Sequence, residues 1–200
     1  MKYLLLCLIP LGILTGCYST NITGYWSAVD QPEKKYKKIL VLGLMKDSLM
    51  RQRMELHIAG DLHELGYVAV TASDEFDALA FTRTEDRDAL LQFSEKGIDA
   101  VLTIVLLDQR TEGFFLPGSM YHLLTSYYSS LYYGLYAPDW YREGVKYAWE
   151  TSFYDIASGS RLYAVQTTTF DPQSIEKLSH EYGKVVVKCM QQHKVIRRQR

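Results

Sequence analysis

The sequence predicts an α/β fold with an α+β tendency: three parallel strands with two crossover helices, an antiparallel hairpin added to the sheet, and a C-terminal helix. Three short apolar runs alternate with segments of helical periodicity, which favours a parallel sheet with right-handed crossovers. A later stretch alternates apolar and polar residues, as a half-buried antiparallel strand does. With 200 residues, 48% hydrophobic and 22% charged, the chain suits a single folded domain.

The first strand and the first helix are expected within residues 37–66. Residues 37–45 form an apolar run introduced by lysines, the pattern of a strand buried on both faces. Asp47-Ser48 then offers N-cap oxygens, apolar residues recur every three or four positions, and Gly66 ends the helix. Arg51 and Glu55 stand one turn apart on this helix and can form an ion pair, which contributes little if it is exposed.

The second and third strands are expected at 67–71 and 98–107, both rich in apolar and β-branched residues. Ser73-Asp74 can cap the helix between them, which is expected within 75–96 and at least from Glu85 onward. The order strand, helix, strand, helix, strand therefore indicates a parallel sheet covered by helices.

A hairpin and a last helix complete the expected domain. Residues 145–154 alternate with period two, 157–160 form a turn, and 162–170 return as the second strand of the hairpin. Asp171-Pro172 supplies an N-cap and a proline at the first helical position, and the apolar residues from Ile175 to Met190 mark the buried face of the helix.

The amino-terminal segment predicts export and lipidation. Residues 1–16 carry one lysine and an apolar run of about a dozen residues, too short to span a bilayer and typical of a signal peptide. The run ends in Leu14-Thr15-Gly16-Cys17, which resembles the bacterial lipobox. That resemblance implies cleavage before Cys17, a diacylglycerol on its thiol and stable membrane anchoring by several acyl chains. The alternative is an ordinary signal peptide that ends near a cysteine.

The remaining boundaries follow from composition. Residues 17–35 read as a lipidated tether, because they lack a sustained apolar period, and Tyr18 in place of Asp resembles an outer-membrane sorting signal. We expect a single α/β domain at 36–193. The basic residues 194–200 are interpreted as a solvated, frayed tail, with binding to anionic lipid or a partner as the alternative.

No catalytic, cofactor or metal motif is evident. His57 and His63 are six residues apart on a helix, outside any HExxH pattern, and no glycine-rich phosphate loop or GxSxG elbow occurs. Acidic residues gather at 74–77 and 85–88; paired acids for glycoside cleavage are the alternative to solvated helix starts. Cys189 is interpreted as buried apolar filler rather than a nucleophile. Polar residues follow the parallel strands, where ligands often bind, but in no specific pattern: Lys46, Asp47, Thr71, Ser73, Asp108 and Arg110.

A tyrosine-rich insertion at 109–144 is the strongest candidate for recognition. Such a long connection is usually functional or disordered, and tyrosine and tryptophan are suited to interfaces because they combine apolar area with a polar tip. The alternative is an apolar flap packed over the sheet edge. The candidate partner-binding residues are Tyr127, Tyr128, Tyr132, Tyr133 and Trp140.

Several motifs resemble a group of uncharacterised lipoproteins of bacterial envelopes, common in Bacteroidetes-like organisms. They are residues 38–42, 97–101, 153–159 with Leu162, and 166–177, within a resemblance that covers about 36–193. The implied fold is similar to small α/β domains such as the amino-terminal domain of TolB and LpoB, which are interaction modules. No functional residue transfers with this resemblance, because it rests on structural motifs.

These observations lead us to expect a non-catalytic accessory or binding protein, anchored through Cys17 to the outer membrane and facing the periplasm. A protein partner in the envelope is expected; nucleic acid is not, since the net charge is −1. Neither a cofactor nor a metal is expected. One alternative is a periplasmic enzyme acting on glycan or peptide. Another is a structural protein that self-associates through an edge strand or the insertion, and the oligomeric state stays open.

Overall fold

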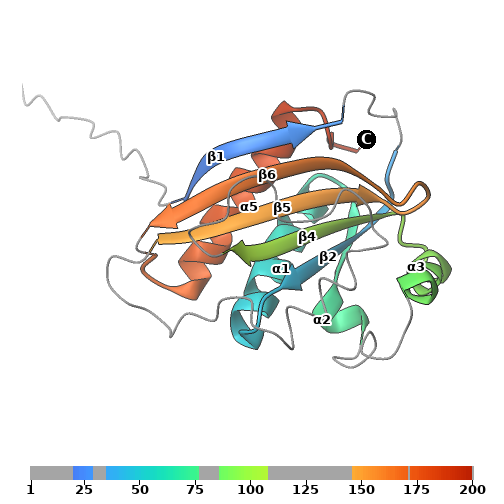
Figure 1. Cartoon of the computed structure of the whole chain (residues 1–200), viewed down its shortest axis with the longest axis horizontal. Coiled ribbons are helices and arrows are strands. Elements are labelled where there is room, and N and C mark those ends of the chain that lie inside the picture. Colours follow the sequence, from blue (N-terminus) through green and yellow to red (C-terminus); the bar gives the residue numbers. More distant parts are fainter. Residues whose placement is uncertain (1–19, 29–34, 77–85, 108–145, 171, 200) are drawn as a thin grey trace, which may run out of the picture.

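The computed structural model describes residues 20–28, 35–76, 86–107, 146–170 and 172–199. Figure 1 shows one mixed sheet with helices on both faces, which confirms the predicted α/β fold class. The elements are β1 (Thr20–Ser27), β2 (Lys38–Leu44), α1 (Ser48–Glu64), β3 (Val68–Thr71), α2 (Ala72–Glu75), α3 (Asp86–Glu95), β4 (Ala100–Leu107), β5 (Lys146–Asp155), β6 (Ser160–Phe170) and α5 (Ile175–Gln192). The six strands lie in the order β1-β6-β5-β4-β2-β3.

The parallel half of the sheet consists of β3, β2 and β4. β2 pairs with β3 from Lys38 opposite Val68 and with β4 from Ile39 opposite Ala100. All eight residues of β4 are buried, which explains its continuous apolar sequence. The three parallel strands predicted from the apolar runs are thus confirmed.

The antiparallel half adds β5, β6 and β1 to the edge of β4. β5 pairs along the whole of β4, and β6 returns beside β5 after the turn at Gly159, whose positive φ of 65° suits glycine. The predicted hairpin is therefore confirmed.

β1 corrects the interpretation of residues 17–35 as a tether throughout. Thr20–Ser27 pairs antiparallel with β6, from Thr20 opposite Thr169 to Ser27 opposite Tyr163. The sequence gives no strand signal here because β1 is an edge strand on which only Thr20 is fully buried. The sheet thus begins sixteen residues before the expected domain boundary at residue 36.

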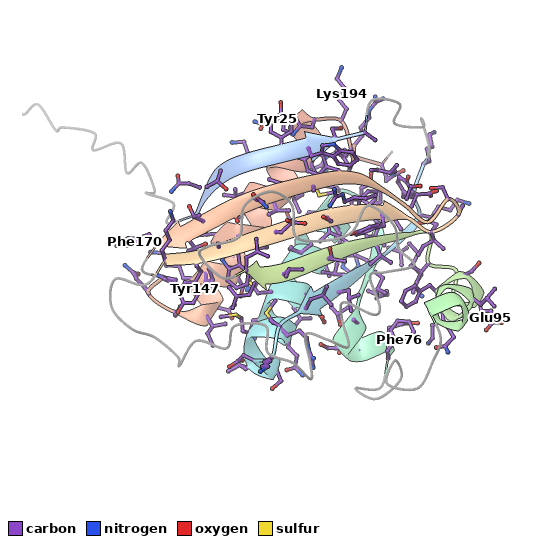
Figure 2. All side chains as sticks on the ribbon, viewed as in Figure 1. Tyr25, Phe76, Glu95, Tyr147, Phe170 and Lys194 are labelled. Carbon is purple, nitrogen blue, oxygen red and sulfur yellow. The ribbon has the colours of Figure 1, made fainter. Side chains whose placement is uncertain are left out.

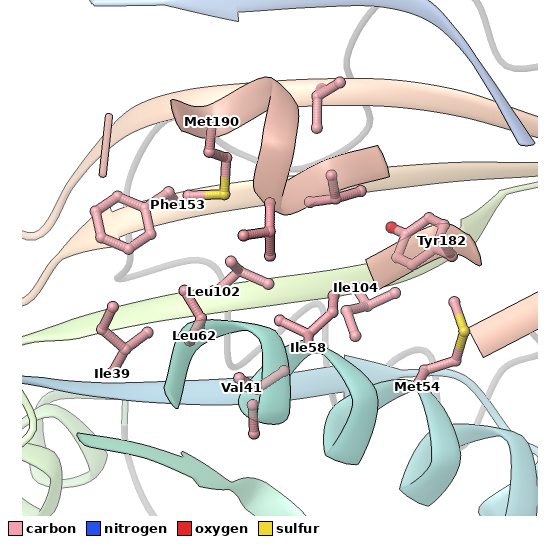
Figure 3. Close-up of a cluster of buried hydrophobic side chains, with 14 of the residues drawn as sticks. Ile39, Val41, Met54, Ile58, Leu62, Leu102, Ile104, Phe153, Tyr182 and Met190 are labelled. Carbon is pink, nitrogen blue, oxygen red and sulfur yellow. The ribbon is translucent and has the colours of Figure 1, made fainter. Parts of the chain in front are cut away.

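The main core fills the space between the sheet and the pair α1 and α5, which pack against each other (Figure 3). Side chains from every second residue of β2, β4 and β5 meet the apolar faces of both helices. The labelled members are Ile39, Val41, Met54, Ile58, Leu62, Leu102, Ile104, Phe153, Tyr182 and Met190. A smaller cluster on the other face joins β2 and β4 to α2 and α3 through Phe76 and Phe93, whose rings lie edge to face.

The last helix begins later than expected. Ser174, not Asp171, is the N-cap of α5, and its hydroxyl accepts a hydrogen bond from the Lys177 N–H at 3.1 Å. Pro172 therefore precedes the helix rather than occupying its first position. α5 is the longest described helix at 18 residues, and no helix in the described ranges is long and apolar enough to cross a membrane.

The carboxyl-terminal segment is packed, which corrects the expectation of a frayed tail. Lys194 adopts a positive φ of 62° and turns the chain back after α5. Ile196 is then 1% exposed within the main core, and the Gln199 N–H donates to the Leu65 carbonyl at 2.7 Å. Ile196, together with the partly buried Val195, thus attaches this basic segment to the domain.

Candidate functional site

The parallel strands β2, β3 and β4 end side by side, at the edge of the sheet where α/β folds usually bind ligands. Their last residues are Leu44, Thr71 and Leu107, and we call this the carboxyl edge. Of the polar residues predicted to follow these strands, Lys46, Asp47, Thr71 and Ser73 lie here. Asp108 and Arg110 lie outside the described residues.

The carboxyl edge continues across the antiparallel half of the sheet. Leu107 pairs with Ala148 near the start of β5, Tyr147 pairs with Thr169 near the end of β6, and Thr169 pairs with Thr20. Figure 1 shows these strand ends together, with the arrowheads of β4 and β6 pointing towards the starts of β5 and β1. The sheet order therefore aligns strand ends that are up to 150 residues apart in the sequence.

Two features singled out in the sequence are attached to this edge. Residues 109–144 connect β4 to β5, so both flanking strands of the insertion meet here. The chain enters β1 at the same edge, three positions after Cys17. Cys17 itself and the candidate partner-binding residues Tyr127, Tyr128, Tyr132, Tyr133 and Trp140 lie outside the described residues.

Glu55 is a buried carboxylate beneath the carboxyl edge. Its side chain is fully buried, with Oε1 accepting from the Gly43 N–H at 2.8 Å and Oε2 accepting from the Ser73 N–H at 3.0 Å. The sequence allows Glu55 to pair with Arg51 and leaves the exposure of that pair open; the structure buries the carboxylate. Two backbone N–H groups, one near the end of β2 and one in the first turn of α2, need acceptors, and the single carboxylate of Glu55 accepts from both.

Burial raises the pKa of Glu55, because ionisation is costly away from water. Hydrogen bonds from Ser73 and Gly43 and the charge of Arg51 oppose this effect without cancelling it. Gly43 leaves room for the arrangement, since a Cβ there would lie 2.7 Å from Arg51 Cγ and 3.1 Å from Glu55 Oε1. Glu55 thus links α1 to β2 and to α2, because each of its carboxylate oxygens accepts a hydrogen bond from a backbone N–H group.

The other polar residues at the edge cap helices. Asp47 Oδ1 accepts from the Met50 N–H at 2.8 Å and caps α1, as predicted. Thr71 Oγ1 accepts from the Asp74 N–H at 3.1 Å and caps α2, so Ser73-Asp74 lies inside this short helix and is not its cap. Thr71 is both the last strand residue and the cap, because α2 follows β3 without a loop.

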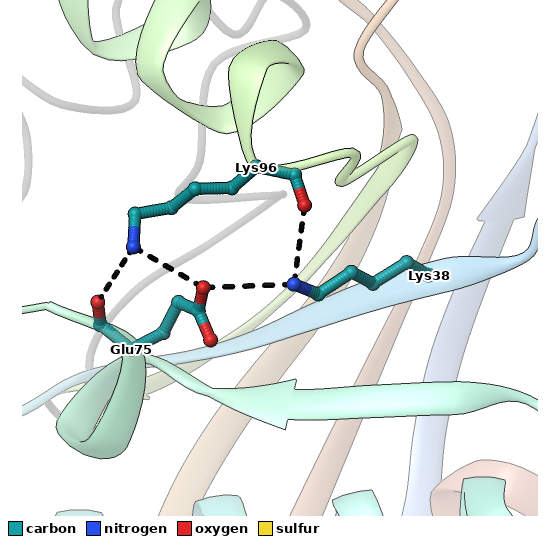
Figure 4. Close-up of polar contacts among 3 residues, drawn as sticks. All are labelled: Lys38, Glu75 and Lys96. Atoms are coloured by element: carbon teal, nitrogen blue, oxygen red, sulfur yellow. Dashed lines mark hydrogen bonds and ion pairs between the residues drawn. The ribbon is translucent and has the colours of Figure 1, made fainter.

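Glu75, the last residue of α2, has two basic partners (Figure 4). Glu75 Oε1 lies 3.5 Å from Lys38 Nζ and 3.2 Å from Lys96 Nζ, and Lys38 also donates to the Lys96 carbonyl at 3.1 Å. Partial burial opposes ionisation, but the hydrogen bond and charge of Lys96 and those of Lys38 lower the pKa of Glu75 overall. This carboxylate joins α2 to the start of β2. Asp77 and Glu85, of the acidic clusters singled out in the sequence, lie outside the described residues.

A cluster that sequence analysis missed links β1, β6 and the end of α5. Tyr163 Oη lies 2.7 Å from His193 Nδ1 and 3.1 Å from Cys189 Sγ, and the ring of Tyr25 stacks on His193. Burial raises the pKa of Tyr163, with further contributions from Cys189 and Tyr25. Cys189 is buried, as predicted. The spacing of four between Cys189 and His193 was the available signal, because it puts both residues on one helix face.

Two other histidines have partners within the domain. His57 Nε2 lies 2.8 Å from Glu176 Oε1 across α1 and α5, and His63 Nε2 lies 2.8 Å from the Ala69 carbonyl. Within the part of the chain that the structure describes, no group of three or more His, Cys, Asp or Glu side chains is arranged to hold a metal ion.

No protein-family model and no curated protein matches this chain. Two solved structures similar to it are PelC dodecamers from Paraburkholderia phytofirmans. One, of a variant with a single substitution, is 10% identical with a TM-score of 0.45 and covers 84% of this chain and 94% of that chain. The other is 10% identical with a TM-score of 0.46 and covers 80% of this chain and 89% of that chain.

Proposed function

We propose that this chain is a non-catalytic accessory protein of the bacterial envelope, anchored through a lipid on Cys17. Its periplasmic α/β domain binds another envelope component. The observation that carries the proposal is Leu14-Thr15-Gly16-Cys17, placed directly after a basic residue and an apolar run of signal-peptide length. The assignment to the outer membrane rests on Tyr18, the residue after the lipidated cysteine.

The arrangement of the carboxyl edge supports a binding role. The strands that flank residues 109–144 end and begin there, as does the strand that leads back to Cys17. A partner recognised by the tyrosines of the insertion would therefore meet the domain at its anchored end. Tyr127, Tyr128, Tyr132, Tyr133 and Trp140 are the candidate contacts, because tyrosine and tryptophan supply large contact areas at low entropy cost.

The polar groups of the edge support a structural rather than a catalytic use. Asp47 and Thr71 cap helices, and both oxygens of Glu55 accept backbone N–H groups. A catalytic acid or base needs a polar atom within reach of substrate. In these three side chains, the oxygen atoms named above already accept hydrogen bonds that hold α1 and α2 in place.

The anchor is tested by metabolic labelling of the full chain with a clickable fatty acid in a bacterial host. The wild type and Cys189→Ala should take up the label and sediment with membranes. Cys17→Ser should lose both properties, because the thiol that accepts the lipid is gone. Label retained in Cys17→Ser would disprove the anchor at this residue.

The binding role is tested by photocrosslinking in the native envelope from position 132. One dominant protein adduct is expected, absent when the crosslinker replaces Val68, which is exposed at the opposite edge of the sheet. Equal, diffuse adducts from both positions would contradict a recognition role for the insertion.

A further inference from the structure

β1 leaves very little chain between the domain and the proposed lipid. Thr20 is 3% exposed and its hydroxyl lies 2.8 Å from that of Thr169, so the chain is held in the sheet from this residue onward. Cys17 lies three positions earlier. Three residues of extended chain span about 11 Å at most. A lipid on Cys17 would therefore keep the start of β1 within about one strand length of the membrane surface.

We infer that the end of the sheet formed by the start of β1 and the end of β6 rests directly on the membrane, with Phe170 contacting the lipid headgroups. This inference rests on the anchor proposed above and adds the orientation of the domain to it. A tether of 19 residues, as residues 17–35 first suggested, would leave the orientation free. The pairing of β1 with β6 removes most of that length.

The side chains at this end suit a lipid surface. Phe170 is the last residue of β6 and is 59% exposed, and its backbone partner is the exposed Lys146 at the start of β5. Figure 2 shows Phe170 at the tip of the sheet, whereas Tyr147 near it is buried in the main core. Ile22, near the start of β1, is 43% exposed. Aromatic rings settle at the apolar boundary of the headgroup layer, and lysines extend their ammonium groups towards phosphates.

Among the described residues, the charges near Phe170 do not oppose this contact. Glu176, in the first turn of α5, is an exposed carboxylate that is paired with His57 at 2.8 Å and Arg53 at 3.7 Å. The ammonium group of Lys177 is also exposed there. Anionic phospholipids would therefore meet a surface whose acidic group already has basic partners.

The test uses the full lipidated chain in vesicles of phosphatidylethanolamine and phosphatidylglycerol. A nitroxide is attached to Phe170→Cys and, as the matched control, to Val68→Cys, which is 57% exposed at the opposite edge. Cys189 is 2% exposed and does not compete for the label. Power-saturation EPR then compares collisions with oxygen, which concentrates in the bilayer, and with a water-soluble nickel chelate.

We expect the ratio of oxygen to nickel collisions to be severalfold higher at position 170 than at position 68. Equal ratios in a lipidated, vesicle-bound chain would overturn the docking and leave the anchor intact. A fall in both kinds of collision at position 170 would show that protein covers it, for example a second copy, and would also overturn the docking. Absence of lipid on Cys17 by mass spectrometry would overturn the anchor and the docking together.

Discussion

The ring of Tyr25 stacks on that of His193, with centroids 4.0 Å apart and planes inclined by 24°. Tyr25 belongs to β1, and His193 is the C-cap of α5. His193 is also held by Tyr163 of β6, so the contact joins the edge strand, its neighbour and the last helix. β1 is therefore an integral part of the domain although most of its residues are exposed.

Tyr25→Ala should lower the free energy of unfolding by about 0.5–1.5 kcal/mol, the usual contribution of an aromatic pair. Urea unfolding followed by circular dichroism measures the loss. Thr23→Ala is the matched control: Thr23 is exposed at the register shift of the same strand and should change stability by less than about 0.5 kcal/mol. Equal effects of the two variants would contradict a specific role for the stacked ring.

Gly43→Ala should destabilise the domain by about 1–3 kcal/mol, the typical cost of overpacking. The new Cβ would approach Arg51 Cγ to 2.7 Å and Glu55 Oε1 to 3.1 Å. Both side chains would have to move, which disturbs the hydrogen bond from the Gly43 N–H to Glu55. Gly60→Ala, in the middle of α1 with nothing within 4 Å of its Cβ, should instead stabilise by about 0.5–1 kcal/mol. Thermal unfolding should show midpoint shifts of opposite sign, and shifts of the same sign would refute this account of Gly43.

Glu55→Gln should cost about 1–3 kcal/mol, because its amide NH₂ leaves the Gly43 or Ser73 N–H without an acceptor. Burial raises the folded-state pKa of Glu55, so the folded chain holds this proton more tightly than the unfolded chain. The contribution of Glu55 to stability is then greatest below the unfolded pKa of about 4.3 and declines as the pH rises through the folded value.

The stability difference between wild type and Glu55→Gln should therefore narrow as the pH rises from below 4.3 towards neutrality. Urea unfolding at a series of pH values measures this. Glu64→Gln, which replaces an exposed carboxylate at the end of the same helix, is the control and should shift stability by less than about 0.5 kcal/mol. A difference that widens with pH would mean that the sign assigned to Glu55 is incorrect.

Ile196→Ala should cost about 2–5 kcal/mol, as for other buried aliphatic residues truncated to alanine. A solvated tail would instead tolerate the change. Arg198→Ala, two residues further and exposed, provides the comparison and should be nearly neutral. Chemical denaturation of both variants decides whether the carboxyl-terminal segment is packed in solution.

The parallel strands and the hairpin could be predicted because the burial of a strand determines the local pattern of apolar residues in its sequence. β4 is buried on both faces and reads as a continuous apolar run, while β5 begins with the alternation of a half-buried strand. Asp47 could be predicted as a cap for a similar reason, since the donor it satisfies is only three residues away. The lipid anchor at Cys17 and the tyrosine contacts of residues 109–144 stay predictions.

The sequence by itself determined the fold class and the strands whose side chains are buried, because those depend on local periodicity. Only the tertiary structure decided what β1, Glu55 and Ile196 do. Thr20 pairs with Thr169, Glu55 accepts from donors 12 and 18 residues away, and Ile196 enters a core built mostly by earlier elements. The carboxyl edge, too, forms only when the strand order places the ends of distant strands side by side. Residues that become neighbours in this way leave no periodic pattern in the sequence.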